Sequence, residues 1–312
     1  MAIPSATGYP QYSGTAILPT MYSDLLLHEF HCRTLISQIS TTKFTGQISK
    51  CGDRVVINRV PRVRARARAL GAPIVHDTVT FGQQEVTIDT ELYSSILMDK
   101  TTVKQVCNSA ALQAGLRKEQ VIAFQEQIDP ALQFHIWSQA DAQNRGTQAG
   151  QQSGQFNLGT IGAPVNVTST NVTEILTRAM SVLNEACAPD DEMFMVLPQI
   201  GAHVLLNSEL KQANVAGLPT SPLFGGKMPG EFAGFTVYKS NFVPQVLDTA
   251  VNRNVFQIIA GMAGATAFAS NVNDTRIMES KDDFNDYLQA RMNHGFRVIE
   301  PKAIVAMYLT FN

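Results

Sequence analysis

The sequence is short of charged residues and of cysteine. Only 16% of its 312 residues are charged, and the net charge is -2, whereas about a quarter of the residues of an average domain are charged. A chain with so few charges often covers much of its surface with partners, so the composition favours an obligate assembly. The four cysteines, Cys32, Cys51, Cys107 and Cys187, form no C-x-x-C pair, which is typical of free thiols in a reducing compartment.

Long apolar runs are also missing. No run is long enough to span a bilayer, so the sequence predicts no membrane segment. Residues 1–5 contain neither a basic region nor an apolar core, and no secretory signal is expected there. The acidic balance argues against a dedicated nucleic-acid-binding surface, because such a surface usually makes the whole domain basic.

Residues 51–100 form the most distinctive stretch of the chain. Apolar and polar residues alternate along both halves, at 54–60 and at 86–92, and successive strand side chains point to opposite faces. Gly71 and Pro73 mark a turn between the halves. We therefore predict a long two-stranded ribbon that projects from the body of the protein. Such a ribbon is marginal alone, and its edges are open to pairing.

Arginine occupies every second position of the outgoing half of this ribbon. In an extended chain these side chains share one face, and they are Arg62, Arg64, Arg66 and Arg68. A row of guanidinium groups requires carboxylates, phosphates or aromatic faces opposite. One interpretation is that the ribbon docks on a neighbouring copy of the same protein. The other is a solvated charged edge that prevents aggregation, and the spacing alone leaves both open.

Beyond the ribbon the chain alternates between helical and extended patterns. Residues 1 to about 20 are predicted to be an extended arm, and residues 23–30 a short helix. The longest helix is expected over residues 117–140, where the apolar side chains keep helical spacing. Pro130 lies inside it and predicts a kink or a break into two helices.

A second body is predicted after the low-complexity residues 143–167. Asn171 and Glu174 are a candidate capping pair for an amphipathic helix, and a short helix is expected near residues 200–206. A loop rich in glycine and proline covers residues 214–231. Strands are predicted at 193–197, 235–238, 255–260, 288–298 and 303–309. The expected fold class is α+β with one long outlying ribbon.

No catalytic chemistry stands out. His28, Glu29 and His31 could hold a metal, and a metal-dependent hydrolase is a remote alternative. They lack the H-E-x-x-H spacing of zinc proteases and a third distant ligand, so a polar helix end is preferred. No nucleophile lies in a recognisable pair with a base. We therefore expect no enzyme, no cofactor and no metal.

The chain resembles the major capsid proteins of tailed bacteriophages, which have the Johnson fold, also described as Hong Kong 97-like. The similarity spans nearly the whole length and is carried by several weak motifs in the same order rather than by one diagnostic motif. These motifs lie at residues 22–27, 52–61, 157–164, 196–198, 234–244 and 294–303.

The resemblance implies names for the parts of the chain. Residues 1–45 would be the N-terminal arm, 46–100 the E-loop ribbon and its base, and 101–164 the peripheral domain with its long spine helix. Residues 165–280 would be the axial domain, and 281–312 would return to the sheet of the peripheral domain. The loop at 214–231 would then be a candidate for contacts near the capsomer axis.

The resemblance also implies a function. The protein would self-assemble into hexameric and pentameric capsomers that form the icosahedral head shell around the double-stranded DNA genome of a tailed phage. It would be made in the host bacterial cytoplasm and reside in the virion. Scaffolding, portal and decoration proteins would be candidate partners, contact with packaged DNA would be non-specific, and no membrane would be involved. An encapsulin-like compartment shell, which shares the fold but encloses protein cargo, is the alternative.

One departure from the family is informative. Some members crosslink a lysine of the E-loop to an asparagine of a neighbour, but this chain has no lysine between Lys50 and Lys100. We therefore expect no isopeptide network of that kind. The arginine row would instead pair with carboxylates, and the acidic clusters at residues 190–192 and 282–283 are the candidates by charge.

Overall fold

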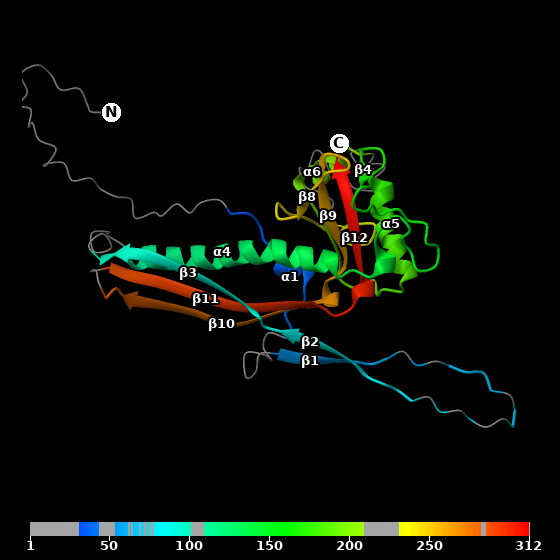
Figure 1. Ribbon diagram of the computed structural model, residues 1–312, viewed down its shortest axis with the longest axis horizontal. Coiled ribbons are helices and arrows are strands. Elements are labelled where there is room, and N and C mark those ends of the chain that lie inside the picture. Colours follow the sequence, from blue (N-terminus) through cyan, green and yellow to red (C-terminus); the bar gives the residue numbers. More distant parts are fainter. Residues whose placement is uncertain are drawn as a thin grey trace, which may run out of the picture.

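The computed structural model describes residues 31–43, 54–61, 63, 65–68, 70–71, 74, 76, 78–100, 109–208, 231–281 and 285–311. The described elements form two larger sheets, a short two-stranded ladder and one long helix (Figure 1). The helices are α1 (Ile36–Ile39), α4 (Ser109–Ser138), α5 (Val172–Glu185) and α6 (Gln199–Leu206). The strands are β1 (Arg54–Arg59), β2 (Gly82–Thr87), β3 (Thr90–Asp99), β4 (Val165–Val167), β5 (Met193–Leu197), β6 (Glu231–Phe232), β7 (Phe235–Lys239), β8 (Gln245–Asp248), β9 (Arg253–Met262), β10 (Thr266–Glu279), β11 (Asn285–Val298) and β12 (Ile304–Phe311).

The main core lies around the larger sheet, which we call the wide sheet. Its strand order is β4-β12-β9-β5-β7-β6, and β8 pairs with the first four residues of β9. Every residue of β5 is buried, and so is every residue of β12 except Phe311. Continuous apolar strands of this kind are buried on both faces, and the helices α5 and α6 and the end of α4 supply the covering side chains. The predicted strands in this region are thus present.

Helix α5 confirms the predicted amphipathic face. Val172, Ile175, Leu176, Ala179 and Leu183 are all buried. The predicted capping pair is wrong in its details. Asn171 is the residue before the helix, but its side-chain oxygen accepts from the N–H of Thr168 instead of from the first turn of the helix.

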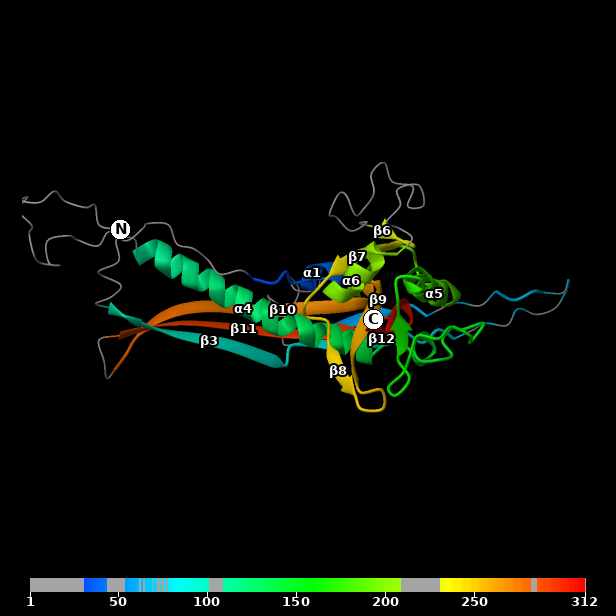
Figure 2. The same ribbon diagram turned by 90° about the horizontal axis from the view of Figure 1, so that it is seen from above.

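The second sheet, which we call the narrow sheet, is antiparallel with the order β10-β11-β3. Helix α4 lies along one of its faces (Figure 1, Figure 2). Nε2 of Gln120 on the helix lies 3.1 Å from the carbonyl oxygen of Leu288 and 3.3 Å from Oγ of Ser94. Leu288 and Ala290 are buried beneath the helix, and the opposite face of the sheet is exposed.

Helix α4 connects the two sheets. At the end of the helix beyond the narrow sheet, the indole Nε1–H of Trp137 donates to the carbonyl oxygen of Met307 in β12 at 3.1 Å. Of the two alternatives predicted at Pro130, the break into two helices is wrong, because one α-helix of 30 residues runs through this position, and the kink stays a prediction. Ile128, Leu132 and Ile136 on either side are fully buried. Their packing offsets the backbone hydrogen bond that proline removes.

Residues 31–35, which precede the ribbon in the sequence, are attached to α4 by polar contacts. Nε2 of His31 lies 2.6 Å from Oε2 of Glu119, and the N–H of Cys32 donates to Oε1 of Glu126 at 3.3 Å. The N–H of Leu35 donates to the buried carboxylate of Asp129 at 3.2 Å. The helix predicted at 23–30 lies outside the described residues, whereas the short helix α1 was not predicted.

Asp129 makes the stability of this attachment depend on pH. Burial raises the pKa of Asp129 from 3.8 to about 6. Because the folded state favours the protonated form, this group stabilises the fold most below pH 3.8 and loses that contribution as pH rises to 6. The loss is about 2–3 kcal/mol.

Asp129→Asn is therefore expected to stabilise the protein clearly more at pH 7.5 than at pH 4.5. The new amide keeps an oxygen for the N–H of Leu35, and its NH₂ can donate to the buried oxygen of Gln133, which has no partner among the described residues. Thermal unfolding at the two pH values measures the difference. Asp190→Asn makes the same chemical change at an exposed site and serves as control. Equal shifts at both pH values would contradict the assignment.

The base of the ribbon is a paired two-stranded ladder. Strand β1 pairs antiparallel with β2, from Arg54↔Thr87 to Arg59↔Gly82. The predicted return strand at 86–92 is wrong as a single element. It ends at Thr87, and after Ile88 and Asp89 the chain begins β3 in a different sheet. Beyond Arg59 and Gly82, none of the described ribbon residues belongs to a strand.

A glycine allows this change of sheet. Gly295 in β11 lies directly against the backbone of Thr87 and Ile88, so that a Cβ at this position would overlap the carbonyl oxygen of Thr87. The absence of a side chain lets the chain cross β11 at close range as it leaves the ribbon. The sequence pattern shows Gly295 only as an interruption of the strand.

Sheet membership divides the chain differently from the predicted ranges. Strand β10 lies within the range 165–280 but belongs to the narrow sheet. Strand β12 lies within the range 281–312 but pairs with β9 and β4 of the wide sheet. Only β11 returns to the narrow sheet as predicted for that range. The names given to the five ranges stay a prediction.

Candidate inter-subunit surfaces

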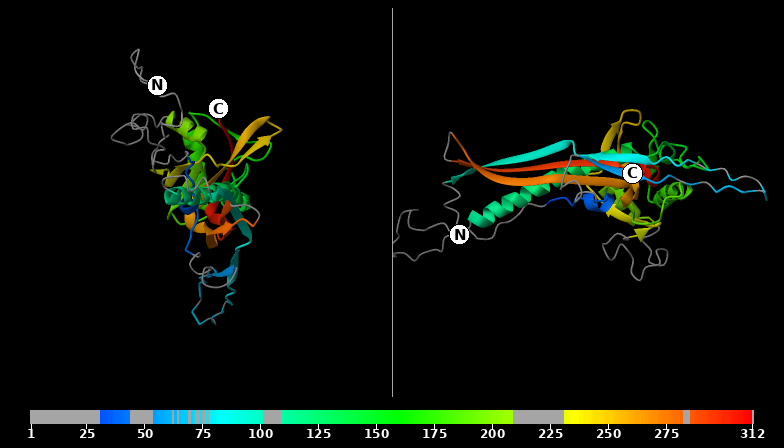
Figure 3. Two further views of the ribbon diagram at one scale, coloured as in Figure 1. Left: turned by 90° about the vertical axis from the view of Figure 1, so that its left-hand side faces the viewer. Right: turned by 90° about the horizontal axis from the view of Figure 1, so that it is seen from below.

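The first candidate surface is the ribbon, defined here as residues 54–87. It extends from the junction of the sheets in the direction opposite to the narrow sheet (Figure 1, Figure 3). Arg66 and Arg68 are exposed on it, whereas Arg62 and Arg64 lie outside the described residues. The ribbon also exposes large apolar side chains, namely Val60, Val63, Leu70, Ile74, Val79 and Phe81. Exposed apolar residues gathered on a projection are a mark of a contact surface.

The base of the ribbon is fixed to the body. The guanidinium of Arg59 pairs with the carboxylate of Glu300, and Nη1 of Arg54 lies 3.1 Å from Oε1 of Glu85 across the ladder. A groove of about 830 Å³ separates the base from the turn after α5 and is lined by Pro61, Cys187 and Met262, among others. The pair of Arg59 and Glu300 thus joins the ribbon to the body, whereas the pair of Arg54 and Glu85 joins the two strands of the ribbon.

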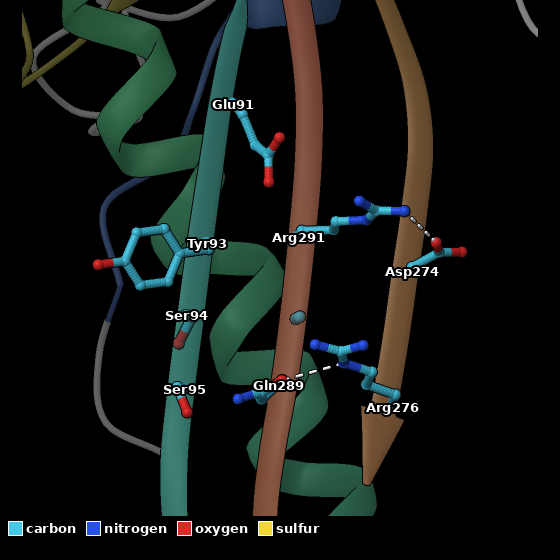
Figure 4. Close-up of a pocket in the computed structure, with 9 residues that line it drawn as sticks. Glu91, Tyr93, Ser94, Ser95, Asp274, Arg276, Gln289 and Arg291 are labelled. Carbon is cyan, nitrogen blue, oxygen red and sulfur yellow. Dashed lines mark hydrogen bonds and ion pairs between the residues drawn. The ribbon is translucent and has the colours of Figure 1, made fainter. Parts of the chain in front are cut away.

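The second candidate surface is the open face of the narrow sheet, which is the face that α4 does not cover. Alternate residues of β3 point outward here, and Tyr93 and Leu97 are 81% and 57% exposed. The register brings Tyr93 beside Arg291, and Arg291 beside Asp274. Figure 4 shows the side chains of Tyr93, Arg291 and Asp274 on the side of the sheet away from the helix. A hollow of about 450 Å³ lies among them.

The charged groups on the open face are partly paired. Nη2 of Arg291 lies 3.0 Å from Oδ2 of Asp274, and Nε of Arg276 donates to Oε1 of Gln289 at 3.0 Å (Figure 4). Glu91 is exposed and has no ion pair among the described residues. The open face thus offers an exposed carboxylate beside exposed aromatic and aliphatic side chains.

At the far end of the narrow sheet, Lys100 forms ion pairs with the neighbouring strands β10 and β11. Its Nζ lies 2.8 Å from Oε1 of Glu279 and 3.3 Å from Oδ1 of Asp286. The hydrogen bond to Glu279, followed by the interactions with Asp286, raises the pKa of Lys100. The same contact with Lys100 lowers the pKa of Glu279. This first lysine after the ribbon is therefore held as a charged ammonium group.

The structure describes some of the remaining residues that the sequence singled out, but not all of them. Asp190, Asp191 and Glu192 are exposed in the turn between α5 and β5, whereas residues 282–283 and most of the loop 214–231 lie outside the described part. Cys32 and Cys187 are free thiols, and the other two cysteines lie outside it.

The residues of the hydrolase alternative do not form a described metal site. His28 and Glu29 lie outside the described residues, and His31 contacts Glu119 and Glu126 of α4. Within the described ranges, no group of three or more histidine, cysteine, aspartate or glutamate residues is arranged to hold a metal ion. No helix in the described part of the chain is long and apolar enough to cross a membrane.

The fold of the chain is similar to that of solved phage structures, capsids among them. A structure from Mycobacterium phage Che8 matches with a TM-score of 0.70 and 20% identity, over 96% of this chain and 98% of that chain. The capsid of the cyanophage P-SCSP1u matches with a TM-score of 0.67 and 14% identity, over 95% and 94%. The capsid of Ralstonia phage GP4 matches with a TM-score of 0.63 and 15% identity, over 97% and 98%.

The predicted fold class is therefore confirmed. No protein-family model matches the sequence, and no curated protein sequence is significantly similar to it. The likeness resides in the fold, and it extends over almost the full length of both chains.

Proposed function

We propose that this protein is the shell subunit of a tailed-phage head. The single observation that carries the proposal is the match of nearly the whole chain to capsid structures, with nearly the whole of those chains covered in return. In this role the protein assembles into hexameric and pentameric capsomers that close an icosahedral shell around double-stranded DNA. The low charged fraction agrees with a protein that buries much of its surface in partners.

The ribbon is the part of the subunit that reaches a neighbour. Within one chain the ribbon and the narrow sheet extend in opposite directions from their junction (Figure 3), so the ribbon does not reach the open face of its own narrow sheet. A second copy can supply what the ribbon of the first contacts. Shell interfaces of this obligate kind commonly bury on the order of 2,000 Å² or more.

The open face of the narrow sheet is a suitable receiving surface. Its carboxylates at Glu91 and Asp274 can accept guanidinium groups of the arginine row, and Tyr93 and Leu97 can pack against the apolar side chains of the ribbon. This surface adds to the two acidic clusters that charge alone suggests. Residues 190–192 remain a competing site, because they are exposed as well.

The enclosed material separates this function from its alternative. A phage head packages DNA, whereas an encapsulin-like shell encloses protein cargo. Contact with DNA in the first case is weak and independent of sequence, in keeping with the net charge of -2. Scaffolding, portal and decoration proteins are the further partners of such a shell.

Electron microscopy of the protein after a sizing column tests the proposal. We expect closed particles or rings of capsomer size from the chain expressed alone or together with a scaffold. Particles purified from infected cells should contain DNA and no stoichiometric enzyme cargo. A chain that stays monomeric under all of these conditions would refute the shell function.

Replacing Arg62, Arg64, Arg66 and Arg68 by glutamate is expected to weaken assembly at least about tenfold, which corresponds to about 1.4 kcal/mol. The defect should change with salt, because exposed ion pairs are screened. Particle yield against salt concentration measures this. Four lysines at the same positions keep the charge but lose the two-pronged geometry, and should give an intermediate yield. Unchanged assembly of the glutamate variant would identify the row as solvated edge charges.

A further inference from the structure

Strand β3 forms an open edge of the narrow sheet, with β10 at the other edge (Figure 2). Within the described part of the chain, β3 pairs with β11 alone, so every second residue of β3 points its N–H and C=O groups away from the sheet. Between Glu91 and Asp99, β3 contains no charged residue, no proline and no glycine, and its register with β11 runs without a bulge. This edge therefore lacks the features that usually prevent the addition of a further strand.

The opposite edge of the same sheet is protected. Strand β10 has an irregular register between Asn271 and Asn273, and such bulges are a common device against pairing. Thr41 covers one end of this edge, since its N–H donates to the carbonyl of Thr266 at 2.8 Å and its carbonyl accepts from the N–H of Phe268 at 3.0 Å. Of the two edges, β3 is thus the one that suits a partner strand.

The two faces of β3 differ in chemistry. The row on the open face is exposed and consists of Glu91, Tyr93, Ser95 and Leu97. The row on the side of α4 is half-buried or buried and consists of Leu92, Ser94, Ile96 and Met98. A strand added at this edge would continue both rows, because strand side chains alternate between the faces. It should therefore carry charged residues on the side of Glu91 and small or apolar residues on the side of α4.

The outgoing half of the ribbon has this alternation. Its arginine row, Arg62, Arg64, Arg66 and Arg68, alternates with Val63, Ala65, Ala67 and Ala69. None of the described residues of this half after Arg59 belongs to a strand. On an added strand the arginines would lie beside Glu91 and Tyr93, and guanidinium groups suit both a carboxylate and an aromatic ring. The alanines would pack against Leu92 and Ile96, which are only half-buried in the single subunit.

We propose that the outgoing half of the ribbon joins the narrow sheet of a second copy as an added strand at the edge of β3. The inference rests on the proposed shell function and deepens it, because it states how the ribbon is held. In strand addition the backbone hydrogen bonds supply affinity and the alternating side chains supply specificity. Glu91 is then the carboxylate nearest to the arginines, since Asp274 lies two strands away in β10 and pairs with Arg291. The ribbon of the same chain extends away from this edge (Figure 3), so a second copy provides the strand.

Charged residues on the alanine side of the ribbon test the added strand. Replacing Ala65 and Ala67 together by aspartate, or together by lysine, is expected to lower particle yield at least about tenfold, because either sign places unpaired charges against the apolar row of β3. The thermal midpoint should stay unchanged, since both alanines are exposed in the subunit. Serine at the same two positions is the matched control and should assemble normally. If the arginine row acted through its charge alone, the lysine variant would assemble as well as the control.

Two measurements on assembled particles locate the strand directly. Backbone amides of residues 90–99 should exchange hydrogen at least about tenfold more slowly in particles than in free subunits, because strand addition engages them in hydrogen bonds. A diazirine analogue of leucine at position 67 should give covalent dimers of this chain, with the crosslink in residues 90–99. The same analogue at Ala114, which is exposed on α4, should give no dimer linked to those residues.

The outcomes separate this inference from the shell function. If the wild-type chain assembles but position 67 crosslinks to another segment, such as residues 190–192, the added strand is wrong and the shell function stands. The same holds if the charged variants assemble like the serine control, or if residues 90–99 exchange equally fast in particles and subunits. If the wild-type chain never assembles, both fall.

Discussion

A variant that lacks residues 62–80 is expected to fold, to stay soluble and to form no shells. The ladder between β1 and β2 ends at Arg59 and Gly82, so the deletion leaves every paired residue of this ladder in place. An Asn-Gly linker can join Pro61 to Phe81, since such a pair suits a tight hairpin turn. Sizing chromatography and electron microscopy should then show capsomer-free subunits.

The fold of this deletion variant serves as its own control. The core around the wide sheet contains none of the deleted residues, so thermal unfolding should be close to that of the wild-type subunit. Normal shells from the variant would contradict the docking role of the ribbon. A variant that unfolds would instead show that the distal ribbon stabilises the body.

Gly295→Ala is expected to lower the free energy of unfolding by about 3 kcal/mol, at the upper end of the usual range for overpacking. The added Cβ would overlap the carbonyl oxygen of Thr87, and it would also lie 3.0 Å from Cα of Ile88. Neither contact is with a flexible side chain, so the backbone must move. Thr87 and Ile88 lie where the ribbon leaves the body, so a shift of the backbone there should redirect the ribbon. We therefore expect particle yield to fall by more than the loss of unfolding free energy alone would cause.

Urea unfolding of the subunit and particle yield measure these two effects. Gly82→Ala is the matched control, because Gly82 is a strand glycine at the base of the ribbon and a Cβ there would meet only Cβ of Arg59 at 3.8 Å. That distance is an ordinary contact, so the control should assemble normally. Wild-type stability and yield for Gly295→Ala would show that β2 and β11 do not approach as closely as the structure indicates.

The parts of the fold that could be predicted from sequence are those with one dominant packing pattern. Strand β5 is a continuous apolar run and is buried throughout, and α5 presents a single apolar face to the wide sheet. In β11 the alternation at period two was readable despite Gly295. In each case the local pattern agrees with the final environment, so propensity and burial point to the same structure.

The parts that were missed depend on contacts distant in sequence. Strand β10 contains Asn273, Asp274, Thr275 and Arg276 in succession, and its strand structure depends on pairing with β11 instead of on an apolar alternation. Val121 belongs to the apolar row of the predicted helix, yet it is half exposed, whereas Ile128 seven residues further along the same face is buried.

The candidate site was predicted in part. The arginine row was visible because four identical residues alternate, and it stays a prediction as a contact site. The open face of the narrow sheet was not found, since its members come from three strands that the register of the sheet brings together. In the structure Glu91, Tyr93 and Leu97 alternate with buried or half-buried residues. The sequence hides this alternation, because both Tyr93 and Leu97 are themselves large and apolar.

The opposite directions of the ribbon and the narrow sheet have a consequence for symmetry. A contact between the ribbon of one copy and the sheet of the next uses two different patches, so it is heterologous. In a pair of copies, each one therefore keeps one of its two patches free for a further copy. Heterologous contacts close into rings when the rotation between copies divides a full turn, and otherwise continue as open helices. The number of copies in a ring is then set by the angle at which the ribbon leaves its base, where Arg59, Glu300 and Gly295 lie, while the contacting residues stay the same.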